Sequence, residues 1–157
     1  MCGAPNLSPP SSRFPIAYIE VRVLSHATED QEKVEMATRN TMPEKLAEEA
    51  KFTKTTCTGH YGNPITFLQT KLTDKEELPT ALEKIASSLN SLDKEQLSRE
   101  MKMHVEKHNL YLRFDKQRAF MGKLILASND PIHFKIHFKN RSPEEITQIC
   151  KNVGLVP

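Results

Sequence analysis

Long hydrophobic runs are missing from this chain of 157 residues, and that absence limits where it can work. The longest apolar runs, such as the one at residues 124–127, span four residues or so, whereas a transmembrane helix needs about 20. The first residues are Cys, Gly, Pro and Ser where a secretory signal would have a basic and then an apolar region. These absences exclude a membrane span and favour a cytoplasmic location.

Cysteine is scarce as well. Cys2, Cys57 and Cys150 lie far apart and form no CxxC pair, so neither a disulfide framework nor a zinc ribbon is expected. We expect three reduced thiols, with Cys57 and Cys150 as small core residues.

Motifs for catalysis, cofactors and metals are also lacking. The sequence has no GxGxxG or Walker loop, no serine in a nucleophile elbow and no distinctive carboxylate pair. His104 and His108 stand four apart on a predicted helix, a spacing that suits zinc, but no nearby residue completes a tetrahedral site. Cys57 and His60 lack a carboxylate to orient them as a nucleophile and base. The sequence therefore predicts no enzyme, no cofactor and no metal site.

The charge balance is close to neutral but uneven along the chain. The formal net charge is +2, yet residues 101–157 carry ten Lys and Arg against five Asp and Glu. This distribution is compatible with a surface that binds a polyanion, although charged surfaces are most often only solvated.

Hydrophobic patterning predicts both strands and helices. Apolar and polar residues alternate over residues 16–25, as in a half-buried strand, and Thr28 and Gln31 have the spacing of a capping box for a helix over residues 29–40. The other expected elements are a short helix over 44–51, strands over 52–58 and 65–73 joined as a hairpin, helices over 75–89 and 92–107 capped by Asp74 and Ser91, strands over 109–114, 123–128 and 132–138, and a terminal helix capped by Ser142 that runs to about residue 152.

This order of elements predicts a single α+β domain over residues 14–157, with a mostly antiparallel sheet covered by helices on one face. Residues 1–13, rich in Pro, Ser and Gly, are expected to form a flexible tail. In the strand over 132–138 the isoleucines and phenylalanines face one way, and His133, Lys135 and His137 face the other. One side of that strand is therefore core and the other is cationic.

The loop between the hairpin strands offers groups suited to RNA. Its two glycines allow close backbone approach, while His60, Tyr61 and Asn63 supply a stacking ring and hydrogen-bonding groups. The alternative is an ordinary hairpin loop whose tyrosine packs against the domain. The sequence leaves both open.

A second candidate segment lies in the basic third of the chain. Tyr111 and Arg113 point away from the predicted core and lead into Lys116, Gln117 and Arg118. Aromatic rings beside guanidinium groups are the combination that single-stranded nucleic acid uses for stacking and phosphate contact. The alternative is a solvated strand followed by a charged turn. We include Lys135 in the same candidate nucleic-acid-binding set.

Three motifs in this chain resemble those of an archaeal family of predicted exosome-associated RNA-binding proteins. They are residues 25–30 (SHATED), the loop over residues 59–65 and residues 112–117 (LRFDKQ). That family was first likened to the double-stranded-RNA-binding domain and looks like the 5S-rRNA-binding ribosomal protein of the large subunit. The resemblance covers most of residues 15–140, and Phe114 stands where many members have leucine. It implies RNA binding, with the exosome or the ribosome as the setting.

Pattern and resemblance together predict a non-catalytic RNA-binding module. The alternative is a protein-interaction adaptor whose open sheet face forms a homodimer or docks another protein. Salt dependence distinguishes the two, because phosphate contacts release counterions and an apolar interface does not.

Overall fold

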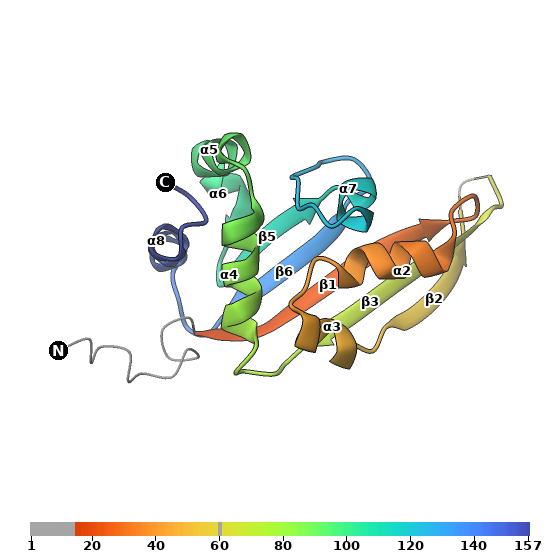
Figure 1. Ribbon diagram of the computed structural model, residues 1–157, viewed down its shortest axis with the longest axis horizontal. Helices are drawn as coiled ribbons and strands as arrows, with labels where there is room; N and C mark the ends of the chain where they lie inside the picture. The colour runs from red at the N-terminus through yellow and green to blue at the C-terminus, as the bar shows by residue number, and fades with distance from the viewer. Residues whose placement is uncertain (1–14, 60) are drawn as a thin grey trace.

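A computed structural model describes residues 15–59 and 61–157 of the chain. These residues form one α+β domain around a six-stranded sheet, with strand order β2-β3-β1-β6-β5-β4 (Figure 1). Every adjacent pair of strands is antiparallel, where the sequence predicts a mostly antiparallel sheet. The expected tail over residues 1–13 lies outside the described residues. The strands are β1 (Ile16–His26), β2 (Thr53–Thr58), β3 (Pro64–Leu72), β4 (Val105–Glu106), β5 (Asn109–Phe114) and β6 (Ile132–Phe138).

Helices cover one face of this sheet. Figure 1 shows α2, α3 and α4 lying across the same side of the strands, and α7 packs against α2 on that side. None of these helices lies over the other face, where Arg22, Gln69, Lys71 and Arg113 are exposed. The helices are α2 (Gln31–Arg39), α3 (Glu44–Glu49), α4 (Leu78–Ser88), α5 (Ser91–Arg99), α6 (Met101–His104), α7 (Lys116–Phe120) and α8 (Pro143–Val153).

The core lies between the sheet and its helices and follows from alternation along the strands. On β6, Phe134 is fully buried, and its neighbours in the same row on β1 and β5, Val21 and Leu112, are also fully buried. The next buried row is Ile136 with Ile19 and Leu110. Successive strand residues point to opposite faces, so burying one set places the intervening residues on the other face.

Helix caps fix the ends of several helices. Ser142 caps α8, as the sequence predicts. Its side chain and that of Glu145 form a full capping box, and Gly154 ends the helix in a left-handed conformation. The cap of α2 is Asp30, whose side chain accepts from the Glu32 amide, so the predicted Thr28 cap is wrong. Likewise Asn90 caps α5 where Ser91 was expected.

The predicted long helix over residues 92–107 is two shorter helices. The helical conformation is interrupted at Glu100, between α5 and α6, and α6 ends at His104. The β4–β5 hairpin follows, and Lys107 in its tight turn has a positive φ. His108 therefore lies outside the helix, and the predicted helical pairing of His104 with His108 is wrong. The side chains instead contact separate backbone carbonyls, those of Tyr111 and Arg141.

The segment after β5 also differs from its prediction. Residues 116–120, for which the sequence offered a charged turn as the alternative, form the short helix α7, which Asp115 caps by accepting from the Arg118 amide. The predicted strand over residues 123–128 is reduced to one bridge, between Phe114 and Leu126. This segment is nevertheless tied to β5, because the Ala127 amide donates to the Arg113 carbonyl.

The two described cysteines have opposite environments. Cys150 is buried, as expected, and burial raises its pKa to about 12. Cys57 is exposed on β2, so its predicted place in the core is wrong. Over the described residues, none of the helices has the length and apolar character that a membrane crossing requires.

Candidate nucleic-acid interface

The uncovered face of the sheet, here called the open face, gathers basic and aromatic side chains from four strands. Its rows follow directly from the strand register: Arg113, His133, Arg22 and Gln69 are neighbours in one row, and Tyr111, Lys135, Glu20 and Lys71 in the next. Tyr18 and His137 are neighbours in a third row, and Leu24 and Phe67 in a fourth. The open face is thus defined by Tyr18, Glu20, Arg22, Leu24, Phe67, Gln69, Lys71, Tyr111, Arg113, His133, Lys135 and His137.

Aromatic rings on the open face pair across strands. The Tyr18 and His137 rings stack with centroids 4.8 Å apart and an interplanar angle of 16°. Tyr111 and His133 lie with centroids 5.7 Å apart in a tilted arrangement. Such cross-strand pairs hold the rings in place and add to sheet stability. The rings on this face therefore already have fixed positions, so a base could stack on them without a large change of side-chain conformation.

Positive charge dominates this face. Arg22, Lys71, Arg113 and Lys135 project from its strands, and Glu20 is the one carboxylate within them. Glu20 is already engaged, because Lys135 Nζ lies 3.7 Å from its Oε1 and Gln69 Nε2 donates to its Oε2 at 3.1 Å. The Lys71 ammonium lies 4.3 Å from the centroid of the Tyr18 ring. Cations next to aromatic rings are suited to bind phosphates beside stacked bases.

The histidines of the open face are held in the neutral form. Burial lowers the pKa of His133, and the positive charges of Arg22, Arg113 and Lys135 lower it further. The pKa of His137 is lowered by burial and then by His108, Lys135 and Lys71. At neutral pH both imidazoles therefore act as rings and hydrogen-bonding groups rather than as cations.

The structure brings together three of the candidate residues from the sequence. Tyr111, Arg113 and Lys135 lie on the open face, on neighbouring strands β5 and β6. The residues that the sequence argument missed come from β1 and β3, above all Arg22 and Lys71. Their strand alternation was a usable signal, but their place beside β6 depends on a sheet order that one sequence does not specify.

Lys116 has a different environment from the one expected. Its ammonium lies 3.0 Å from Glu29 Oε1 and 2.8 Å from Asp130 Oδ2, and it donates to the Leu24 carbonyl. Its side chain is only 10% exposed. Lys116 is therefore already paired with two carboxylates and lies apart from the open face, while its predicted role in RNA binding stays a prediction.

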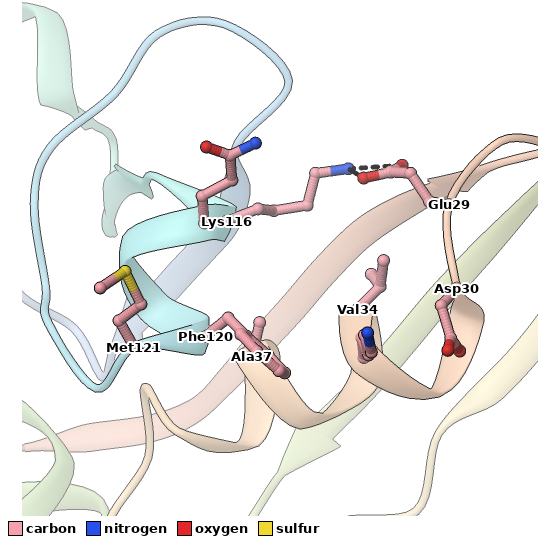
Figure 2. A pocket seen from close by; sticks show the side chains of 9 residues that line it. Glu29, Asp30, Val34, Ala37, Lys116, Phe120 and Met121 are labelled. Carbon is pink, nitrogen blue, oxygen red and sulfur yellow. Dashed lines mark hydrogen bonds and ion pairs between the residues drawn. The ribbon is translucent and has the colours of Figure 1, made fainter.

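Gln117 and Arg118 also lie away from the open face. They lie on α7, which packs against α2 on the helix-covered side, and both are exposed. Gln117 lines an apolar groove between these two helices, together with Val34, Phe120 and Met121. Figure 2 shows the labelled side chains of this groove and the ion pair of Lys116 with Glu29 at its end.

The hairpin loop lies at one end of the molecule. Tyr61 is 87% exposed, so it is not a buried anchor, and with Asn63 it borders a hollow whose other wall is formed by residues 26–28. His60 lies outside the described residues. The Asn63 carbonyl accepts from the Gly59 amide and closes the loop.

The three sequence motifs therefore meet in space. The loop and the turn after β1 line one hollow, with Ile65 paired to His26, and that same turn supplies Glu29 to Lys116 at the start of α7. His26, Glu29 and Asp130 are close enough to share a cation, with ligand atoms within 4.8 Å of one another. The Lys116 ammonium contacts both carboxylates, and His26 Nε2 lies 3.1 Å from Asp130. A lysine thus supplies the positive charge at this cluster.

A family model described as RNA binding matches residues 18–138, from β1 to the end of β6. The chain belongs to this RNA-binding family. The matched range includes every residue that defines the open face. Membership supports an RNA-binding role and RNA as the partner.

Archaeal relatives agree with this assignment. The chain is 32% identical over 124 residues to the RNA-binding protein PAB1135 of Pyrococcus abyssi, covering 77% of this chain and 80% of that protein. It is 31% identical over 142 residues to the uncharacterized protein MJ0213 of Methanocaldococcus jannaschii, covering 85% and 95% of the two chains. Among solved structures, Mth689 of Methanothermobacter thermautotrophicus has a TM-score of 0.73 and 29% identity, covering 88% of this chain and 97% of that one.

Proposed function

We propose that this chain is a non-catalytic module that binds RNA on the open face of its sheet. The observation that carries the proposal is the juxtaposition of Arg22, Lys71, Arg113 and Lys135 with the rings of Tyr18 and Tyr111 on an uncovered surface. Cations supply sequence-independent affinity for phosphates, and the rings supply stacking. The hairpin loop with Tyr61 and Asn63 extends this surface at its far end.

Ultraviolet cross-linking tests the location of the RNA. A uridine-rich RNA is irradiated with the full chain, and the modified peptides are identified by mass spectrometry. We expect adducts in β1, β5 and β6, which carry Tyr18, Tyr111 and His133. Adducts confined to α2 and α7, on the other side of the sheet, would contradict the proposal.

The wider setting follows from the resemblance described above. We propose that the chain acts in the cytoplasm with RNA-processing machinery such as the exosome, or with the ribosome. Affinity purification from cells, with and without ribonuclease treatment, tests this. Recovery of exosome or ribosomal proteins only from untreated lysate supports a shared RNA, and recovery of neither complex contradicts the proposed setting.

An adaptor function without RNA is the second candidate, and the groove between α2 and α7 favours it. Phe120 and Met121, which line this groove, are 42% and 69% exposed. Clustered apolar exposure of this kind is typical of protein-binding surfaces. A homodimer or protein complex that persists at high salt, with no measurable RNA affinity, would favour the adaptor over the RNA-binding module.

A further inference from the structure

A hollow of about 290 Å³ lies on the open face, beside the row that contains Arg22 and Arg113. Leu24 and Phe67, which are neighbours across β1 and β3, supply apolar surface to it. Phe67 is 44% exposed. The other residues lining the hollow are Arg22, Val23, Arg113, Asp130, Pro131 and His133.

Two guanidinium groups line the same hollow as this apolar surface. Arg22 and Arg113 lie on β1 and β5, each paired with His133 on the intervening strand, and both are exposed. Two strand spacings separate them, which places their backbones about 10 Å apart. The one carboxylate in the lining, Asp130, contacts Lys116 and His26 through its Oδ2. The hollow therefore combines an aromatic and aliphatic surface on β1 and β3 with two exposed cations on β1 and β5.

His133 lies between the two arginines and forms part of the wall of this hollow. Burial lowers the pKa of this imidazole, and the charges of Arg22, Arg113 and Lys135 lower it further. The wall between the two guanidinium groups is therefore a neutral ring at neutral pH.

We propose that this hollow receives an unpaired nucleobase of single-stranded RNA, stacked on Phe67, with Arg22 and Arg113 contacting the flanking phosphates. The inference rests on the proposed function and adds the class of RNA. A base within a duplex is already stacked and paired, so it enters the hollow only after it leaves the helix, at a cost in free energy. The open face consequently prefers single strands and unpaired loops to continuous duplex.

The test compares one strand in two forms. A fluorescein-labelled uridine-rich 12-mer is titrated with the full chain by fluorescence anisotropy, alone and annealed to its complement. We expect tighter binding to the single strand. Phe67→Ala should weaken single-strand binding about 5- to 150-fold, the range for loss of one stacked base, and leave duplex binding unchanged.

Two further variants make the result specific. Phe67→Leu keeps an apolar side chain but removes the ring, so it should retain the wild-type melting temperature and still lose most of the single-strand preference. Lys71→Ala changes a cation in another row of the open face and should weaken both RNA forms equally.

Equal wild-type affinity for both forms, with Phe67→Ala and Phe67→Leu unchanged, would overturn the base-binding hollow. If Lys71→Ala still weakened RNA binding in that experiment, the proposed function would stand although the base-binding hollow would not. Absence of binding to either RNA would overturn both.

Discussion

The two faces of the sheet are built from alternate residues of the same strands, yet different requirements shape them. On β6, Ile132, Phe134, Ile136 and Phe138 are fully buried beneath helices, while His133, Lys135 and His137 remain accessible on the other side. Burial of the first set supplies much of the stability of the domain. The second set contributes little to the core and is therefore available for ligand chemistry. A strand can thus carry the fold and the proposed binding surface at once, without competition between them.

The largest expected effect on stability comes from comparing substitutions at two neighbouring residues of β6, one on each face. Phe134→Ala should lower the free energy of unfolding by about 3–5 kcal/mol, because it removes a fully buried ring that packs edge-on against Phe114. Lys135→Ala, one residue away, should change stability by less than about 1 kcal/mol, since its ion pair with Glu20 is partly exposed. Urea unfolding of both variants measures the difference. Equal losses of stability would contradict the division between faces.

A second comparison sets Lys116, which is ion-paired, against Arg118, which is exposed on the same helix. Lys116→Ala leaves Glu29 and Asp130 without their shared cation and should cost about 1–3 kcal/mol of stability, an amount moderated by the partial exposure of both carboxylates. Arg118→Ala, two residues further on α7, should change stability by no more than about 0.5 kcal/mol because the side chain is exposed. Thermal melts with RNA titrations measure both properties. Normal stability with strongly reduced RNA affinity in Lys116→Ala would restore this lysine to the binding set.

The open face should also produce a smaller dependence of stability on pH. The pKa of His133 in the folded state is lowered, so the unfolded chain binds a proton more readily. Its contribution is therefore fully present above the unfolded pKa of about 6.5 and is lost as pH falls toward the folded value. Melting temperatures at pH 7.5 and 5.5 should show a smaller decrease in His133→Gln than in the wild type. An identical decrease in both would contradict this assignment.

Most of the fold could be predicted from local sequence patterns. The alternation over β1 and β6 and the Ser142 cap of α8 each express a strong local preference, and the structure confirms them. The helix α7 could not be predicted in this way, because five residues are too few to form a stable helix alone. It depends on packing against α2, to which the Asn40 side chain ties it by donating to the Ala119 carbonyl.

The candidate site shows the same division between local and distant information. The position of Tyr111, Arg113 and Lys135 on one face follows from alternation on two adjacent strands. The ion pair of Lys116 with Glu29 joins residues 87 apart in sequence, so sequence alone does not distinguish this lysine from a solvated one. Arg22 and Lys71 join the site only through the order of strands in the sheet.

The most direct test of the central claim removes equal charge from two regions of the molecule. One triple variant replaces Arg22, Lys71 and Arg113 of the open face by alanine, and its matched control replaces the exposed Lys33, Arg118 and Lys123, on α2, on α7 and just after it. RNA affinity is measured as a function of salt for both and for the wild type. Each lost phosphate contact on a single strand reduces the log–log slope by about 0.7, so the open-face variant should lose about two units of slope and the control almost none. Loss of slope in the control, with wild-type behaviour in the open-face variant, would contradict the account.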